Sequence, residues 1–337
     1  MQHVRHAVRE KEIRKTDMAL DLFAECNKAD TIGITGHIKP DGDCVGSCLA
    51  LMQYLRKLFP EKTVELFLEE PEKALAGIPL RDQIISDFPE REPFDVFIVC
   101  DTNAERVGEA RKYFKSAKKT INIDHHISNA EGTGMVNLVV PHAAAAGEII
   151  YSLIEKQYMD EQIAELLYMA LAHDTGVFHF ANTTPDTLRI AADLLEYKFD
   201  FSKMLDDTFF SRPKETNLLL AHALMDQRFF YGGKLLIAYT TYKLMREVGA
   251  TRDDTGGIVE RLRITMGVEC AMYIYEKKPG QWKASMRSSS DLVNVAKVGE
   301  AYGGGGHDRA SGCEYNGNLE DFIDGLDKAV GEQLEGK

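Results

Sequence analysis

The sequence lacks the features that mark secreted, disulfide-bonded or membrane-spanning chains. Its six cysteines form no Cys-x-x-Cys pair and several lie in apolar stretches, which is typical of reduced, buried thiols. No run approaches about 18 apolar residues, the length that a membrane-spanning helix needs. The segment 1–15 is charged throughout and has no apolar core, so we expect no signal peptide. We therefore expect a cytoplasmic protein that does not enter a membrane.

An excess of positive charge is also missing. The chain has 40 lysines and arginines against 53 aspartates and glutamates, which gives a formal net charge of −13. Lysine and arginine supply most of the affinity of proteins for long nucleic acids, because they neutralise backbone phosphates. We therefore expect no binding of long duplex. A small anionic substrate can still be held by local groups and metal ions.

Hydrophobic patterning in the first half predicts an α/β fold with a parallel, doubly wound sheet. Short β-rich apolar runs alternate there with helical patterns, the order that parallel strands and crossover helices require. The predicted strands are 31–35, 64–68, 96–100, 120–123 and 137–140. Helices are expected over 45–58 and 160–172. Another begins at Thr184-Pro185, where a capping residue precedes a proline.

The organisation changes after about residue 210. A helical stretch, 214–227, leads into a predicted hairpin over 228–241, and a second hairpin is expected around Pro279-Gly280. Strand pairs flanked by helices predict a smaller α+β domain. We divide the chain into a catalytic domain (1–208), a helical linker (209–228) and a substrate-binding domain (229–337), with the active-site cleft between the two domains.

Acidic and imidazole side chains follow three of the predicted strands. They are His37, Asp41 and Asp43 after the first, Asp101 after the third, and Asp124, His125 and His126 after the fourth. Because the carboxyl ends of parallel strands meet at one edge of a sheet, we expect these side chains to lie together. Asp174 follows the predicted helix 160–172 and adds a further carboxylate.

Each of these motifs also has an ordinary structural interpretation. Asp43 could cap the following helix, Asp101 could be a turn residue, and His173-Asp174 could end a helix stopped by Gly176. Their coincidence favours a metal site, because a buried cluster of unpaired carboxylates is too costly to keep ionised. Oxygen ligands with one or two imidazoles suit manganese, and also magnesium or cobalt, better than sulfur-rich zinc sites. Two such ions can share a water and clamp a phosphoryl group, so we predict phosphoester hydrolysis.

A glycine run near the C-terminus is the other candidate site. It comprises Gly303, Gly304, Gly305 and Gly306 and is followed by His307 and Arg309. A glycine run is often only a flexible linker. Here, bare backbone N–H groups beside an imidazole predict an anion cradle. Arg287, at the end of a predicted strand, is either a bidentate phosphate ligand or a solvated arginine.

With these motifs, the chain resembles the DHH phosphoesterase superfamily, in the branch with a DHH-associated C-terminal domain. Within it, the resemblance is to oligoribonucleases (nanoRNases) that also act as pAp phosphatases, and it covers essentially the whole chain. It implies one metal ion bound by His37, Asp41 and Asp101, and a second bound by Asp43, Asp101, His125 and Asp174. Asp101 would bridge the two ions. His126 would face the substrate phosphate and Asp124 would orient the histidines.

The resemblance also implies a role for the second domain and shows two departures. Arg287, the glycine run with His307, and Arg309 would hold the nucleotide. Cys44 and Cys48 stand where relatives often carry alanine or serine, which adds oxidation sensitivity. The segment 143–146 is all alanine where relatives often show serine or threonine, so a hydroxyl contact there is in doubt.

The predicted function is degradation of very short oligoribonucleotides to nucleoside 5′-monophosphates, with dephosphorylation of pAp to AMP, by hydroxide activated by two metal ions. The main alternative is a phosphodiesterase for cyclic dinucleotides or for linear dinucleotides such as pApA. An inorganic pyrophosphatase is expected to lack the glycine run with His307, and a non-catalytic nucleotide-binding module would have a broken ligand set. The expected partners are short single-stranded RNA, pAp or dinucleotides. A homodimer, the polarity of digestion and the preferred length are left open.

Overall fold

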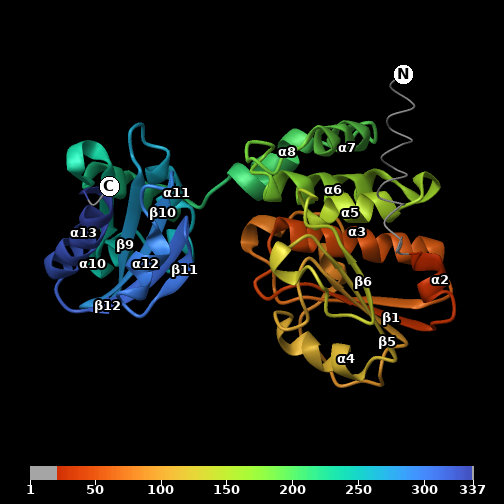
Figure 1. Cartoon of the computed structure of the whole chain (residues 1–337). Coiled ribbons are helices and arrows are strands. Elements are labelled where there is room, and N and C mark those ends of the chain that lie inside the picture. Colours follow the sequence, from red (N-terminus) through yellow and green to blue (C-terminus); the bar gives the residue numbers. More distant parts are fainter. Residues whose placement is uncertain (1–20, 336–337) are drawn as a thin grey trace. The chain divides into compact units, whose positions relative to one another are not determined.

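The computed structural model describes residues 21–335 of the chain (Figure 1). The segment 1–15, for which we expect no signal peptide, lies outside the described residues. The chain divides into two compact units after Ser211. Within the described part, no helix is both long and apolar enough to cross a membrane.

The N-terminal unit is built on a six-stranded sheet in which all neighbouring strands are parallel, in the order β3-β2-β1-β4-β5-β6. The strands are β1 (Thr31–Thr35), β2 (Thr63–Phe67), β3 (Ile84–Ile85), β4 (Val96–Cys100), β5 (Lys119–Asp124) and β6 (Val136–Val139). The doubly wound parallel sheet is therefore confirmed. The strand order reverses between β1 and β4, and a crevice opens beyond the carboxyl ends of strands at such a point.

Helices cover both faces of this sheet. Those on one face are α3 (Gly42–Leu58), α5 (Ala146–Leu153), α6 (Glu161–Asp174) and α7 (Pro185–Leu195), with the short helices α2 (Leu22–Cys26) and α8 (Phe201–Leu205) nearby. Figure 1 shows α3 between the sheet and α6, and α4 (Arg111–Ser116) on the opposite face. A Cβ at Gly46 would lie 2.4 Å from the carbonyl oxygen of Leu166. The glycine thus permits the close approach of α3 and α6.

The predicted start of α7 is confirmed in detail. The Thr184 hydroxyl accepts a hydrogen bond from the backbone N–H of Thr187, and the Thr187 hydroxyl accepts one from the N–H of Thr184. Pro185 occupies the first helical position, where a missing N–H removes no helical hydrogen bond.

The C-terminal unit contains a second six-stranded sheet, in the order β11-β12-β10-β9-β8-β7. Its strands are β7 (Arg228–Phe230), β8 (Leu235–Thr240), β9 (Cys270–Lys278), β10 (Gln281–Ser288), β11 (Gly305–His307) and β12 (Ala310–Asn316). All neighbours are antiparallel except β8 and β9, which are parallel. The predicted hairpins are found as β7–β8 and β9–β10.

Helices also pack against both faces of the second sheet. Side chains from α9 (Lys214–Met225), α10 (Tyr242–Glu247) and α11 (Ile258–Arg263) form the core on one face. The core on the other face includes α12 (Val295–Glu300) and α13 (Leu319–Glu335). The segment 209–228, which we expected to be a helical linker, thus includes α9. Leu219 and Ala223 of this helix are buried in the core that α10 and α11 share.

Candidate metal centre

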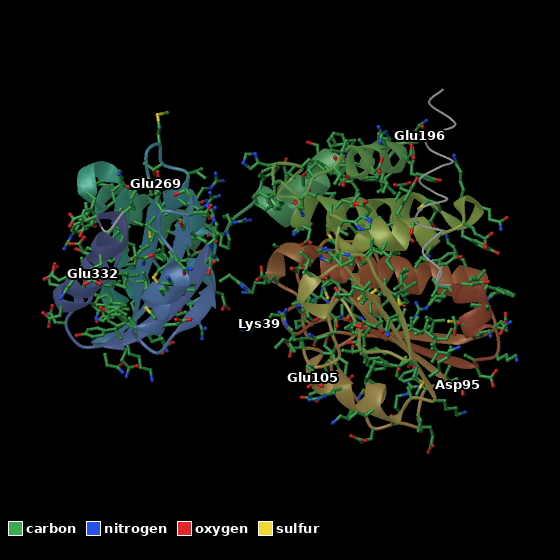
Figure 2. All side chains as sticks on the ribbon, in the orientation of Figure 1. Lys39, Asp95, Glu105, Glu196, Glu269 and Glu332 are labelled. Atoms are coloured by element: carbon green, nitrogen blue, oxygen red, sulfur yellow. The ribbon has the colours of Figure 1, made fainter. Side chains whose placement is uncertain are left out.

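The loop after β1 carries three of the predicted ligands and is marked by Lys39 in Figure 2. Asp41, and not Asp43, caps α3: its Oδ1 accepts a hydrogen bond from the backbone N–H of Cys44 at 3.1 Å. His37 Nδ1 lies 2.8 Å from the carbonyl oxygen of Ile38, to which it can donate. The lone pair of Nε2 is then available to coordinate a metal ion. This nitrogen lies 3.6 Å from Asp41 Oδ1 and 3.5 Å from Asp101 Oδ2.

Asp43 is completely buried and is held by neutral donors. Its Oδ1 accepts from the Ser47 hydroxyl at 2.8 Å and from the Gly147 N–H at 3.0 Å, and its Oδ2 accepts from the Ala146 N–H at 2.7 Å. The alanine segment 143–146 therefore contacts the site through a backbone N–H, which needs no hydroxyl.

Asp101 lies immediately after β4 in a left-handed conformation, with φ of 58°. This conformation is uncommon for a residue with a side chain and is found disproportionately at functional sites. The side chain is buried, and its two oxygens face different histidines: Oδ2 is 3.5 Å from His37 Nε2, and Oδ1 is 3.3 Å from His125 Nε2. This is the arrangement that a bridging carboxylate requires.

Asp124 organises the segment that follows β5. It is buried, and its Oδ1 accepts hydrogen bonds from the backbone N–H groups of His125 and His126 and lies 2.8 Å from His126 Nδ1. Its Oδ2 accepts from the Asn129 amide at 2.7 Å. These contacts fix the backbone and the ring of His126, which agrees with the orienting role predicted for Asp124.

His125 connects Asp101 with the carboxylates of Asp43 and Asp174. Its Nδ1 lies 3.3 Å from the carbonyl oxygen of Ala143, and its Nε2 faces three carboxylates. The distances from Nε2 are 3.7 Å to Asp43 Oδ2, 3.3 Å to Asp101 Oδ1 and 3.2 Å to Asp174 Oδ2. Asp174 reaches this position as the last residue of α6, which ends in a left-handed turn at Gly176.

The electrostatics of the cluster show a shortage of positive charge. Burial, together with the charges of Asp101 and Asp174, raises the pKa of Asp43 well above its ordinary value. Burial and Asp101 raise the pKa of Asp174 to about 7. Burial alone would lower the pKa of His125, but Asp101 and Asp43 outweigh it and raise that pKa to about 10. The raised pKa values favour the protonated forms of these carboxyl and imidazole groups, and divalent cations would replace the protons.

The donor set fits divalent metal ions. Three groups have ligand atoms within 4.8 Å of one another: His37, Cys44 and Asp101; Asp101, His125 and His126; and Asp43, His125 and Asp174. Asp101 Oδ1 and His125 Nε2 are buried without a hydrogen-bond partner among the described residues. The N-terminal unit thus brings all six predicted ligands together, and their roles as ligands remain predictions.

Sequence reasoning missed residues that support this centre. The amide of Asn122 is buried within β5 and donates to the carbonyl oxygens of Val99 and Thr102, at 3.1 and 2.8 Å. Its oxygen accepts from Asn129, which also binds Asp124. A polar residue in the middle of an apolar strand was the available signal. Cys44 was noted only for oxidation, although its thiol lies within one of the three ligand groups.

The predicted substrate-binding residues lie in the C-terminal unit. The glycine run, His307 and Arg309 form an exposed segment, of which Gly305–His307 is the edge strand β11. His307 and Arg287 both pair with Ala310 of the intervening strand β12. They therefore share a row and a face of the sheet, about 10 Å apart. Arg287 Nη2 lies 2.7 Å from Glu260 Oε1, and Arg309 Nη2 lies 2.8 Å from Asp291 Oδ1.

Comparison with known proteins places the chain in a family. Residues 31–171 match the DHH family, N-terminal domain, and residues 232–332 match the DHHA1 domain. The bifunctional oligoribonuclease and PAP phosphatase NrnA of Thermus thermophilus is 32% identical, over 93% of this chain and 94% of the relative. The protein of the same name from Bacillus subtilis is 28% identical, over 88% and 93% of the two chains.

A solved structure shares the fold over most of the chain. It is an exopolyphosphatase-related protein from Bacteroides fragilis with a TM-score of 0.83 and 21% identity, covering 93% of this chain and 95% of that one. The resemblance read from the sequence is confirmed: the chain belongs to the DHH phosphoesterase family, in the branch that joins a DHH domain to a DHHA1 domain.

Proposed function

We propose that the chain is a divalent-metal-dependent hydrolase that degrades very short oligoribonucleotides to nucleoside 5′-monophosphates and converts pAp to AMP. The observation that carries the proposal is the buried Asp101 carboxylate between His37 and His125, with further carboxylates at both sides. Relatives named as bifunctional oligoribonucleases and PAP phosphatases match this chain over most of both lengths, which supports the substrate class.

In this proposal two ions are held by the predicted ligands. The first set is His37, Asp41 and Asp101, and the second is Asp43, Asp101, His125 and Asp174. Manganese fits these oxygen-rich sets with imidazole, and magnesium or cobalt are the alternatives. When bound, such ions activate water for attack and offset the negative charge of the phosphoryl group.

In this proposal, His126 holds the substrate phosphate. The Asp124 carboxylate raises the pKa of His126 by hydrogen bonding to its Nδ1, which favours the protonated ring. Its Nε2–H can then donate to a phosphate oxygen. Because Asp124 is itself fixed by Asn129, the ring does not have to be ordered when substrate binds.

In the C-terminal unit, Arg287 and His307 are proposed to bind a phosphate of the nucleotide. They share one face of the sheet, and Gly305 leaves its backbone open, since a Cβ there would meet no atom within 4 Å. Arg287 would have to exchange its contact with Glu260 for the substrate. A chain with net charge −13 has little further means of holding a long polyanion, so short substrates are favoured.

Product analysis on a substrate panel tests this function. The full chain with Mn²⁺ is given pAp, pApA, oligoribonucleotides of about two, five and twenty residues, a cyclic dinucleotide and pyrophosphate, and products are separated by chromatography. We expect AMP from pAp, mononucleotides from the shortest RNAs, and a steep fall in initial rate for the longest strand. Equal or faster digestion of the long strand would indicate a processive exonuclease. A preference for the cyclic dinucleotide or pyrophosphate would favour those alternatives.

A further inference from the structure

Cys44 places a sulfur atom among the predicted ligands of the first metal ion. Its Sγ, a ring nitrogen of His37 and a carboxylate oxygen of Asp101 lie within 4.8 Å of one another. The side chain is fully buried in the first turn of α3, and its thiol is within hydrogen-bonding reach of the His37 ring. Oxygen and nitrogen donors are therefore not the only atoms available at this position.

The surrounding backbone leaves room for the sulfur. Gly36 precedes His37, and a Cβ at Gly36 would lie only 2.2 Å from Cys44 Sγ. The sulfur therefore packs directly on the main chain that carries the His37 ligand. The contact joins the residue before His37 to the first turn of α3. It therefore also holds the Cys44 thiol close to His37.

Cys48 provides a contrast within the same helix. It is equally buried one turn later, and its thiol contacts those of Cys44 and Cys100. Among the described residues, however, Cys48 is not part of any group with metal-binding geometry. Of these three thiols, only that of Cys44 belongs to a ligand group among the described residues.

We propose that Cys44 contributes Sγ as an additional ligand to the ion held by His37, Asp41 and Asp101. This inference rests on the proposed function, because it takes the two-ion centre as given. On coordination the S–H bond breaks, the sulfur keeps the electron pair for the metal, and the proton passes to solvent. No oxidant or reductant is needed.

The consequence is a centre with two unequal positions. A thiolate favours thiophilic ions such as cobalt, zinc and cadmium more than it favours manganese or magnesium. The other position, formed by Asp43, Asp101, His125 and Asp174, offers only oxygen and nitrogen. The first position is therefore expected to be selective for softer ions, while the second retains the preference of an oxygen-rich site.

Cobalt absorption spectroscopy tests this assignment in the full chain. Wild type, Cys44→Ala and Cys48→Ala are stripped of metal with a chelator and loaded with Co²⁺. We expect a sulfur-to-cobalt charge-transfer band in the near ultraviolet for wild type and Cys48→Ala, and its loss in Cys44→Ala. Co²⁺ affinity, measured by chelator competition, should fall roughly tenfold or more in Cys44→Ala, with a smaller change for Mn²⁺. Cys44→Ser, which preserves the size of the side chain, should match Cys44→Ala.

Two results would overturn the assignment: a charge-transfer band that persists in both Cys44 variants, or wild type that binds Co²⁺ without the band. Failure of the proposed function looks different. Wild type that binds no divalent ion would contradict the metal centre, and Mn²⁺-loaded wild type that hydrolyses neither pAp nor short RNA would contradict the proposed activity.

Discussion

The two units hold their charged groups in opposite ways. In the N-terminal unit, Asp43 and Asp101 are buried and turned toward histidines and other carboxylates. In the C-terminal unit, Arg287 and Arg309 lie nearer the surface and already pair with Glu260 and Asp291. A buried cluster of like charges is costly unless cations enter it, whereas exposed ion pairs contribute little and exchange easily. The electrostatic demand for a cofactor is therefore concentrated in the first unit.

The largest expected effect comes from Asp101→Asn. Asparagine tolerates the left-handed backbone at this position, so the change removes charge without forcing the turn. Because both predicted ion positions use Asp101, we expect loss of most bound metal and at least a roughly thousandfold fall in kcat/KM, about 4 kcal/mol. Metal is measured by elemental analysis, and kcat/KM with pAp as substrate.

Asp95→Asn is the matched control, since Asp95 precedes the same strand at its opposite end and is labelled in Figure 2. It should keep its full metal content. Full metal content in Asp101→Asn would contradict the bridging role.

A smaller effect is expected from Arg287→Ala or His307→Ala. These variants should keep their metal and lose roughly tenfold to a hundredfold in kcat/KM, because they remove phosphate contacts only. Glu260→Gln removes the charged partner of Arg287, so we expect a lower KM from it, by roughly threefold. Steady-state kinetics with parallel metal analysis separate these effects. Metal loss in Arg287→Ala would break the distinction between the two units.

The N-terminal cluster should make the stability of the metal-free protein depend on pH. The pKa of Asp174 is raised from 3.8 to about 7 and that of His125 from 6.5 to about 10, so the folded state binds extra protons. Both contributions are present at low pH and are lost as pH rises through the folded pKa values.

In chelated protein, the free energy of unfolding should therefore fall by at least about 1 kcal/mol between about pH 5 and about pH 8, measured by urea denaturation. Mn²⁺ should remove most of this loss, and Asp174→Asn should reduce it. An equal pH dependence with and without Mn²⁺ would show that cations do not replace these protons.

The smallest effects concern the glycine run. A Cβ at Gly305 meets open space, so Gly305→Ala should change the free energy of unfolding by no more than about 0.5 kcal/mol. If the nucleotide approaches this backbone, turnover should still fall, by roughly threefold. Gly304→Ala would place its Cβ 2.2 Å from the carbonyl oxygen of Gly312 and should destabilise the hairpin by about 1 to 3 kcal/mol. Thermal unfolding and pAp hydrolysis measure the two effects. Unchanged turnover in Gly305→Ala would show that the nucleotide does not approach this part of the backbone.

Much of the fold could be predicted because its strands are strongly patterned. The predicted strands 31–35 and 96–100 agree with β1 and β4, since 96–100 is a continuous apolar run and 31–35 is rich in β-branched residues. β3, with only Ile84 and Ile85, was missed because two residues carry no periodicity, and this strand depends on pairing with β2. The helical stretch predicted over 214–227 agrees with α9, but its burial against the second sheet could not be predicted, because a buried helix and a connecting helix have similar patterns.

The candidate site was predictable where each residue follows its own strand or helix. What local patterns could not show were contacts between distant segments. The buried Asn122 amide, the approach of Cys44 to His37 and the pairing of Arg287 with Glu260 all depend on packing. The residues that support the centre through packing were therefore harder to predict than the proposed ligands themselves.

Titration of the metal-free chain with Mn²⁺ tests the central claim most directly. Hydrolysis of pAp is followed as Mn²⁺ is added to chelated protein of known concentration. We predict no activity without metal and a rise to a plateau at two equivalents per chain. Activity that survives chelation, or a plateau at one equivalent, would contradict the two-ion centre.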